Sequence, residues 1–435
     1  MMPTVAVCTL GCKVAQYESE AIGEAFERAG ATLVSEDTVA DIYVINTCTV
    51  TAESDRKSRQ TVRRAISHNP NAVVAVVGCY SQRSAREVAS IEGVSIVLGT
   101  QDKLSVVPIA FGILTGERER GYISAPDLQG AGFEEMKITR APRTRAYVKI
   151  EDGCESRCSY CAIRLARGPV RSKPVSEVIS EVEGLYARGT REVVLTGIET
   201  GSYGKDLGEG ASLAELILEL DRRHSCDRLR LGSLAPELVG EEFIKKVAGA
   251  KILAPHFHLS VQSGSDNVLR AMRRRYNREG ALRTIELFRE YIPRAQFTTD
   301  LMVGFPGESE EDFLSTVDFA RRARFLDAHV FAYSKREGTD AASMKGQIDS
   351  ATKKERSRRL IEVCRGVRDS VLDEIVARGE PLSVILETER EGIFSSHSSE
   401  FCEVELEARG FSQGDMVRAI PVSHENGIIK GRLAD

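Results

Sequence analysis

The chain has 435 residues, of which 42% are hydrophobic, so it is long enough for two or three domains with packed cores. No run of 18 apolar residues occurs, which excludes a simple membrane span. The net charge of −5 excludes a globally basic nucleic-acid binder, although residues 371–435 carry 13 acidic and 6 basic residues against 51 and 53 in the rest. The N-terminus lacks the pattern of a secretory signal, so we expect a cytoplasmic protein with no membrane partner.

The first hundred residues alternate between strand and helix patterns. Apolar β-branched runs predict strands at 5–10, 41–46, 72–77 and 94–98, and helical periodicity predicts helices at 15–29, 54–66 and 84–91. Strands separated by helices predict a parallel sheet, here a flavodoxin-like α/β domain over residues 1–113. The loose, glycine-rich stretch that follows predicts a linker at 114–139.

A second alternation covers the middle of the chain. Strands are predicted at 146–150, 192–196, 228–231, 257–261, 296–303 and 328–333, with helices at 175–187, 213–221, 237–247, 267–272, 279–291 and 310–323. Six β/α units in a row favour a partial (β/α)6 barrel over residues 140–370, although periodicity alone leaves an open sheet possible.

The C-terminal segment changes to an all-β pattern. A long charged helix is predicted at 352–378, and short strands follow at 382–388, 392–396, 401–406, 416–422 and 427–433. Five strands in so short a segment predict a small β-barrel of the oligonucleotide-binding kind over residues 371–435.

The most specific feature is a loop on which Cys154, Cys158 and Cys161 are spaced C-x3-C-x2-C, directly after a predicted strand. Clustered cysteines in a reducing compartment favour metal binding or catalysis over disulfides. Three thiolates can bind three irons of a four-iron cluster and leave the fourth open to substrate. The alternative is a structural zinc site, but that site needs a fourth ligand, and no Cys or His follows within 60 residues.

A second group of cysteines is dispersed, because Cys12, Cys48 and Cys79 each follow on a different predicted strand. The carboxyl ends of parallel strands share one edge of a sheet, so these residues are expected to lie close together. A second cluster and an ordinary buried role are equally open at this point. The other four cysteines are interpreted as core or surface thiols: Cys8, Cys226, Cys364 and Cys402.

The cysteine loop, with Tyr160 before its last cysteine, resembles the radical S-adenosylmethionine superfamily. The order of the three segments resembles the methylthiotransferase family, which has an N-terminal cluster domain, a radical core and a C-terminal RNA-binding barrel known as TRAM. The strings TLGCKV at 9–14, NTCTVT at 46–51, ARGPVR at 166–171 and YSKREGT at 333–339 are similar to one branch of this family. That branch makes 2-methylthio-N6-threonylcarbamoyladenosine beside the anticodon of transfer RNA.

The resemblance implies two [4Fe-4S] clusters, one on Cys154, Cys158 and Cys161 and one on the N-terminal group. It implies an enzyme that uses two S-adenosylmethionine molecules to transfer a methylthio group to carbon 2 of the adenosine. Transfer RNA and an electron donor of the flavodoxin or ferredoxin type are the implied partners, and the sulfur donor stays unidentified. No catalytic residue is predicted beyond the cluster ligands.

Contacts to S-adenosylmethionine are expected at the cysteine loop and at the strand ends of the core. The candidates are Tyr160, Thr196, Gly197, Glu199, Ser233, Ser260, Gln262 and Gly304. Gly197 is expected to allow close approach, Glu199 to meet an ammonium group, Ser233 and the 260–262 turn to reach the ribose, and Gly304 to approach the adenine. Turn capping and a solvated loop acid explain these residues nearly as well.

Basic residues recur beside both cysteine groups and are expected to contact RNA phosphate, which requires only positive charge. The candidates are Arg56, Lys57, Arg59, Arg167 and Arg171. A solvated protein face is the ordinary alternative for any single basic run.

Three functions therefore compete. The leading hypothesis is methylthio transfer to threonylcarbamoyladenosine in transfer RNA. The first alternative is methylthio transfer to another transfer RNA adenosine or to a ribosomal-protein side chain. The second is a non-catalytic RNA-binding protein whose fold is stabilised by a closed structural metal site.

Overall fold

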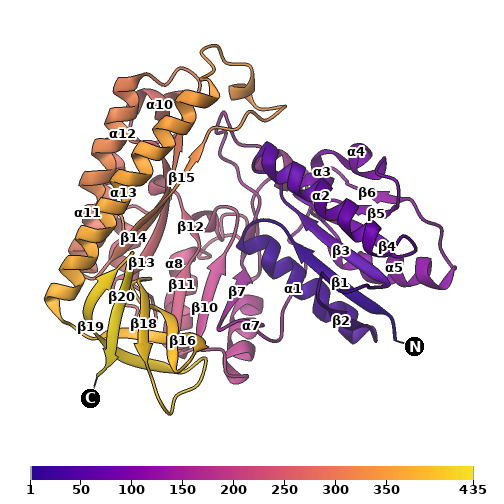
Figure 1. Cartoon of the computed structure of the whole chain (residues 1–435), viewed down its shortest axis with the longest axis horizontal. Coiled ribbons are helices and arrows are strands. Elements are labelled where there is room, and N and C mark those ends of the chain that lie inside the picture. The colour runs from indigo at the N-terminus through magenta and orange to yellow at the C-terminus, as the bar shows by residue number, and fades with distance from the viewer. Residues whose placement is uncertain (1, 435) are drawn as a thin grey trace.

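The computed structural model describes residues 2–434 and shows three parts that follow the chain (Figure 1). An N-terminal α/β part, in indigo and purple, lies beside a central core, and a small yellow barrel lies at one end of that core. No helix within the described residues is long and apolar enough to cross a membrane.

The N-terminal part is a six-stranded parallel sheet with the order β2-β1-β3-β4-β5-β6. Its strands are β1 (Thr4–Thr9), β2 (Thr32–Val34), β3 (Ile42–Thr47), β4 (Val73–Gly78), β5 (Val94–Leu98) and β6 (Tyr122–Ser124). Its helices are α1 (Lys13–Arg28), α2 (Ala52–His68), α3 (Cys79–Arg83), α4 (Ala85–Ala89) and α5 (Val106–Thr115). Every residue of β3 and β4 is buried, as expected for central parallel strands. The order of β1 to β5 confirms the predicted flavodoxin-like sheet.

The predicted linker at 114–139 is not structureless, because β6 lies in it and pairs with β5. A strand of three residues is too short for hydrophobic alternation to reveal. The helix α5 was also missed, since Pro108 and Gly112 interrupt its apolar run although Pro108 lies in the first turn, where proline is tolerated. The sheet therefore extends past the predicted domain end at residue 113.

The core contains six parallel β/α units, as predicted. Its strands are β7 (Arg145–Lys149), β10 (Glu192–Thr196), β11 (Arg228–Leu231), β12 (Ser233–Leu234), β13 (His256–Gln262), β14 (Gln296–Val303) and β15 (Asp327–Ala332). They form the sheets β7-β10-β11 and β12-β13-β14-β15, and Gly232 separates β11 from β12. The helices between them are α7 (Val175–Ala187), α8 (Leu213–Arg223), α9 (Glu241–Val247), α10 (Asp266–Ala271), α11 (Arg278–Tyr291) and α12 (Glu310–Ala323).

The C-terminal strands close into a barrel with the order β16-β17-β18-β20-β19, as predicted. They are β16 (Leu382–Arg390), β17 (Ile393–Ser398), β18 (Glu403–Glu407), β19 (Met416–Glu425) and β20 (Ile428–Leu433). The helix α13 (Ser350–Arg378) contacts both β15 of the core and β19 of the barrel. The predicted domain boundary between residues 370 and 371 therefore falls inside one continuous helix.

The acidic barrel docks onto basic residues of the core. Arg145, the first residue of β7, pairs with Glu387, and Arg294 pairs with the buried Glu400. Arg230 on β11 donates to the carbonyl oxygen of Ser399 (3.1 Å). Part of the negative charge of the C-terminal segment is thus neutralised by the core.

Candidate active site

The cysteine loop of the core follows β8 (Glu151–Asp152) and starts at a position that requires glycine. Gly153 has a φ of +88°, and a Cβ atom there would overlap the carbonyl oxygen of Pro169. The next amide, of Cys154, donates to the carbonyl oxygen of Gly168 (3.0 Å). The chain on both sides of the loop is therefore closely packed, which fixes where the first cysteine begins.

The three thiols of this loop have the chemistry of cluster ligands. Burial raises the pKa of Cys154 to about 12 and also raises the pKa of Cys161. Metal binding would displace these protons, since the thiolate is the ligand form. Among residues 2–434, no three His, Cys, Asp or Glu side chains surround a point as ligands of one ion. A four-iron cluster binds each cysteine through a different iron, so its thiolates stand farther apart than the ligands of one ion.

A half-buried arginine lies beside the loop. Arg274 Nη1 is 3.7 Å from Cys158 Sγ, and the ring of Tyr276 packs against the guanidinium at 5.6 Å. Its Nη2 donates to the carbonyl oxygen of Ser260. This cation is placed to stabilise negative charge on a cysteine ligand. The sequence shows Arg274 only as one of several adjacent arginines, so its role was missed.

Two acidic side chains meet at the end of β10. Glu151 Oε2 accepts a hydrogen bond from the amide of Glu199 (2.8 Å), and Glu199 Oε1 accepts one from the amide of Ala235 (3.1 Å). Burial raises the pKa of Glu199 to about 7 and the pKa of Glu151 well above its ordinary value. A Cβ atom on Gly197 would lie 2.5 Å from Glu151 Oε2, so the close approach at this glycine is to a side chain of the protein. No sequence signal pointed to Glu151.

The dispersed cysteines follow three adjacent strands. Cys12, Cys48 and Cys79 lie just after the carboxyl ends of β1, β3 and β4. A Cβ atom on Gly11 would lie 3.1 Å from Cys48 Cβ, so the loop that carries Cys12 passes directly beside Cys48. Gly78, which precedes Cys79, has a φ of +97° and leaves no space for a side chain. The topology of the sheet thus gathers residues that are far apart in the sequence.

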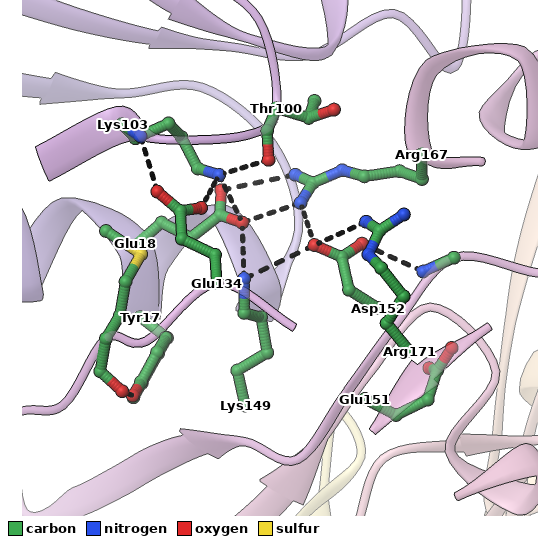
Figure 2. Close-up of polar contacts among 12 residues, drawn as sticks. Tyr17, Glu18, Thr100, Lys103, Glu134, Lys149, Glu151, Asp152, Arg167 and Arg171 are labelled. Atoms are coloured by element: carbon green, nitrogen blue, oxygen red, sulfur yellow. Dashed lines mark hydrogen bonds and ion pairs between the residues drawn. The ribbon is translucent and has the colours of Figure 1, made fainter. Parts of the chain in front are cut away.

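A buried charge network joins the N-terminal part to the core (Figure 2). Its centre is Arg167, the last residue of α6 (Ile163–Arg167), which has no solvent exposure. Arg167 Nη1 lies 2.6 Å from Glu18 Oε1 and 3.1 Å from Asp152 Oδ2, and its Nε lies 3.1 Å from Cys79 Sγ. The helix α6 follows the cysteine loop and packs against α3, which begins at Cys79. Cys79 therefore lies in this buried interface, and the cysteine loop of the core leads into it through α6.

A second set of contacts joins the N-terminal part to the core. Arg336 donates to Thr49 Oγ1 (2.7 Å) and to Asp55 Oδ2 (2.6 Å), and the amide of Ala52 donates to Ser334 Oγ (3.1 Å). Arg336 and Ser334 belong to the string YSKREGT, and Thr49 follows Cys48 directly. Two of the strings that carry the family resemblance thus contact each other.

Comparison with known proteins assigns the chain to a family. The profile of the Radical SAM superfamily matches residues 148–320, and that of Uncharacterized protein family UPF0004 matches residues 4–99. The threonylcarbamoyladenosine tRNA methylthiotransferase MtaB of Bacillus subtilis (strain 168) is 40% identical over 93% of this chain and 90% of its own length. The chain belongs to the radical S-adenosylmethionine methylthiotransferase family.

Further relatives of this methylthiotransferase agree. MtaB of Thermotoga maritima is 36% identical and covers 99% of this chain and 97% of its own length. A tRNA-2-methylthio-N(6)-dimethylallyladenosine synthase of Carboxydothermus hydrogenoformans is 34% identical over 83% of each chain. The solved radical S-adenosylmethionine methyltransferase TsrM of Kitasatospora setae has a TM-score of 0.59 at 18% identity, over 79% of this chain and 77% of its own. That likeness concerns the fold alone.

A radical S-adenosylmethionine domain binds S-adenosylmethionine and a [4Fe-4S] cluster. The residues of this methylthiotransferase fit such a group, since three soft thiolate donors lie on one loop with the guanidinium of Arg274 beside Cys158 Sγ.

Several predicted cofactor residues have contacts within the protein. Gly304 leaves room for Lys353 of α13, and the carbonyl oxygen of Ser260 is occupied by Arg274. Tyr160 packs edge-on against Phe305, with ring centroids 6.5 Å apart. The others stay predictions: Thr196 and Gln262 are buried, Gln262 has a left-handed φ of 73°, and Ser233 is half-buried.

The predicted RNA contacts divide into two kinds. Arg56 and Lys57 are exposed on α2, and Arg59 is half-buried and donates to the hydroxyl of Tyr80. Arg167 and Arg171 are only 0% and 3% exposed, so they do not lie at a surface that RNA can reach in this structure. A run of basic residues does not reveal which of them packing will bury. Here Arg167 lies against Glu18 of the N-terminal part, and Arg171 lies against Asp152 and Pro169 of the core.

The four remaining cysteines are buried, as a core role requires: Cys8, Cys226, Cys364 and Cys402.

Proposed function

We propose that this methylthiotransferase transfers a methylthio group to carbon 2 of N6-threonylcarbamoyladenosine adjacent to the anticodon of transfer RNA. It would use two S-adenosylmethionine molecules and two [4Fe-4S] clusters. The observation that carries this proposal is the shared interface, where α6 leads from the core cysteine loop to Cys79 of the N-terminal group. The MtaB relatives, similar over nearly the whole chain, support the threonylcarbamoyl substrate.

Each of the two cysteine groups would hold one cluster. Cys154, Cys158 and Cys161 would hold the cluster that faces S-adenosylmethionine, and Cys12, Cys48 and Cys79 would hold the second. When bound, the first cluster supplies one-electron reduction of S-adenosylmethionine, which no amino-acid side chain provides. An aromatic C–H bond is inert to side-chain acids and bases, and this explains the need for such a cofactor.

The protein's own residues would position the reactants. Arg274 stabilises the charge on Cys158, and Glu199 at the end of β10 would meet the ammonium group of S-adenosylmethionine. The contacts of Glu18 and Arg336 join the N-terminal part to the core, which would hold the two cysteine groups in fixed positions relative to each other.

Transfer RNA would approach over the exposed basic face of α2, where Arg56 and Lys57 lie on the helix that follows Cys48. A donor of the flavodoxin or ferredoxin type would supply electrons. We also propose that the enzyme acts in the cytoplasm, where transfer RNA is found.

The test is an anaerobic assay of the reconstituted full chain with S-adenosylmethionine, sulfide and a chemical reductant. Three acceptors are compared: transfer RNA with threonylcarbamoyladenosine, transfer RNA with dimethylallyladenosine, and ribosomal protein. Mass spectrometry of nucleosides and peptides should find the methylthio group only on the first acceptor. Methylthiolation of the dimethylallyl acceptor alone would favour the second candidate, which the relative at 34% identity supports. Product on protein alone would overturn both.

A further inference from the structure

The buried charges around Arg167 do not balance among themselves. Four cations take part, namely Lys103, Lys149, Arg167 and Arg171, and three carboxylates, namely Glu18, Glu134 and Asp152. All seven side chains are at most 7% exposed. A buried charge without a counter-charge is costly, so the excess of one cation calls for one more anion.

The geometry shows where that anion belongs. The guanidinium of Arg167 uses its Nη atoms on Glu18 and Asp152, and its Nε is directed at Cys79 Sγ, 3.1 Å away. Cys79 is itself buried and begins α3 directly after Gly78, whose backbone admits no other residue type. Burial raises the pKa of the Cys79 thiol, and a metal cluster that replaces its proton would supply this anion as a thiolate.

We propose that Arg167 is a positioning residue that holds Cys79 as a cluster ligand against the core. Its Nε–H group donates to the ligand sulfur, while its Nη groups bind Glu18 of α1 and Asp152 of β8. This inference rests on the second cluster of the proposed function. It implies that the arginine stabilises the reduced, more negative state of the N-terminal cluster, because hydrogen bonds to cluster sulfurs and nearby positive charge raise its reduction potential.

The experiment uses the full chain with Cys154→Ala, Cys158→Ala and Cys161→Ala, so that all bound iron belongs to the N-terminal group. Arg167→Met is added to this background, and Arg171→Met serves as the matched control. Arg171 pairs with the same Asp152, and its hydrogen bonds and ion pairs within residues 2–434 involve no sulfur atom. Iron and sulfide are counted after anaerobic reconstitution, and the reduction potential is measured by titration followed by electron paramagnetic resonance.

Arg167→Met should move the potential to a more negative value, and Arg171→Met should move it much less. Equal shifts in both variants, or no shift with iron retained, would overturn the role of Arg167 and leave the second cluster intact. A background protein that binds no iron would overturn the second cluster as well, so the two failures are distinguishable. If Arg167→Met does not fold, Arg167→Lys gives the same test, since one ammonium group cannot serve two carboxylates and a sulfur.

Discussion

The two cysteine groups reach the same interface by different routes. Cys154, Cys158 and Cys161 lie within eight residues on one loop, whereas Cys12, Cys48 and Cys79 are gathered by three parallel strands. Each group has one arginine at a sulfur, Arg274 at Cys158 and Arg167 at Cys79, but only Arg167 is completely buried in an ion network. A local loop can place ligands by spacing alone, while a dispersed set depends on the sheet and on the domain packed against it.

The largest expected effect separates the two groups by iron content. The wild type should bind about eight irons after reconstitution, and replacing either group by alanine should leave about four, since each [4Fe-4S] cluster holds four. Only the Cys154→Ala/Cys158→Ala/Cys161→Ala variant should lose cleavage of S-adenosylmethionine. Iron analysis and chromatography of the cleavage product measure both. A wild type with about four irons would reduce the N-terminal cysteines to core residues.

A substitution at Glu18 tests how far the N-terminal cysteine group depends on the buried charge network. Glu18→Gln keeps the shape of the side chain but removes the charge that Lys103, Lys149 and Arg167 share. Losing one partner of a buried network should lower the free energy of unfolding by about 3–5 kcal/mol, measured by urea denaturation of the metal-free chain.

Glu219→Gln is the control, because Glu219 pairs with Arg222 and Arg223 at the surface. That change should stay within about 0.5 kcal/mol. Similar losses for Glu18→Gln and Glu219→Gln would mean that the buried network does not hold the two parts together.

The buried Glu199, which follows β10 of the core, predicts that the stability of the protein depends on pH. Burial raises the pKa of Glu199 from 4.5 to about 7, so the folded chain keeps a proton that the unfolded chain releases. The stability that the Glu199 carboxyl contributes is complete below pH 4.5 and is lost as the pH rises through 7. Glu199→Gln should remove this slope and stabilise the metal-free chain at pH 8 by up to about 3 kcal/mol, at about 1.4 kcal/mol per pKa unit. Denaturant titrations of the wild type and of Glu199→Gln at pH 4.5 and pH 8 measure the free energies of unfolding that test this prediction. The same change with pH in both proteins would contradict a buried Glu199 that titrates.

The smallest effect concerns the surface next to the dispersed group. Arg56→Ala with Lys57→Ala should weaken binding of transfer RNA several-fold and reduce the dependence of log K on log salt by about 0.9 for each lost phosphate contact. Filter binding at several salt concentrations measures both quantities. Arg322→Ala, an exposed arginine on α12 of the core, is the control. Equal effects of the two changes would mean that α2 is not a specific RNA surface.

The features that depend on short stretches of sequence are the ones that could be predicted. The longer strands and most helices follow from hydrophobic period. The strands β2 and β6 were not predicted because each has only three residues, and α5 was not predicted because Pro108 and Gly112 interrupt its apolar run. The convergence of Cys12, Cys48 and Cys79 was predictable because strand ends of a parallel sheet share an edge.

The misplaced residues were those whose environment another part of the chain supplies. Arg167 and Arg171 are predicted to contact RNA, but both are buried, Arg167 against Glu18 of the N-terminal part and Arg171 against Asp152 of the core. Lys353 of α13 lies where a side chain at position 304 would be, and the contact of Gly304 with adenine stays a prediction.

The sequence by itself therefore determined the order of the three parts, the barrel at the end, and the cysteine loop, because period and spacing act over short stretches. Only the tertiary structure decided that Arg167 joins Glu18, Asp152 and Cys79, that Glu151 lies against Glu199, and that Arg274 lies beside Cys158. These contacts link segments up to about 150 residues apart. The physical reason is that burial and counter-charges are set by packing between domains, which no single stretch of sequence encodes.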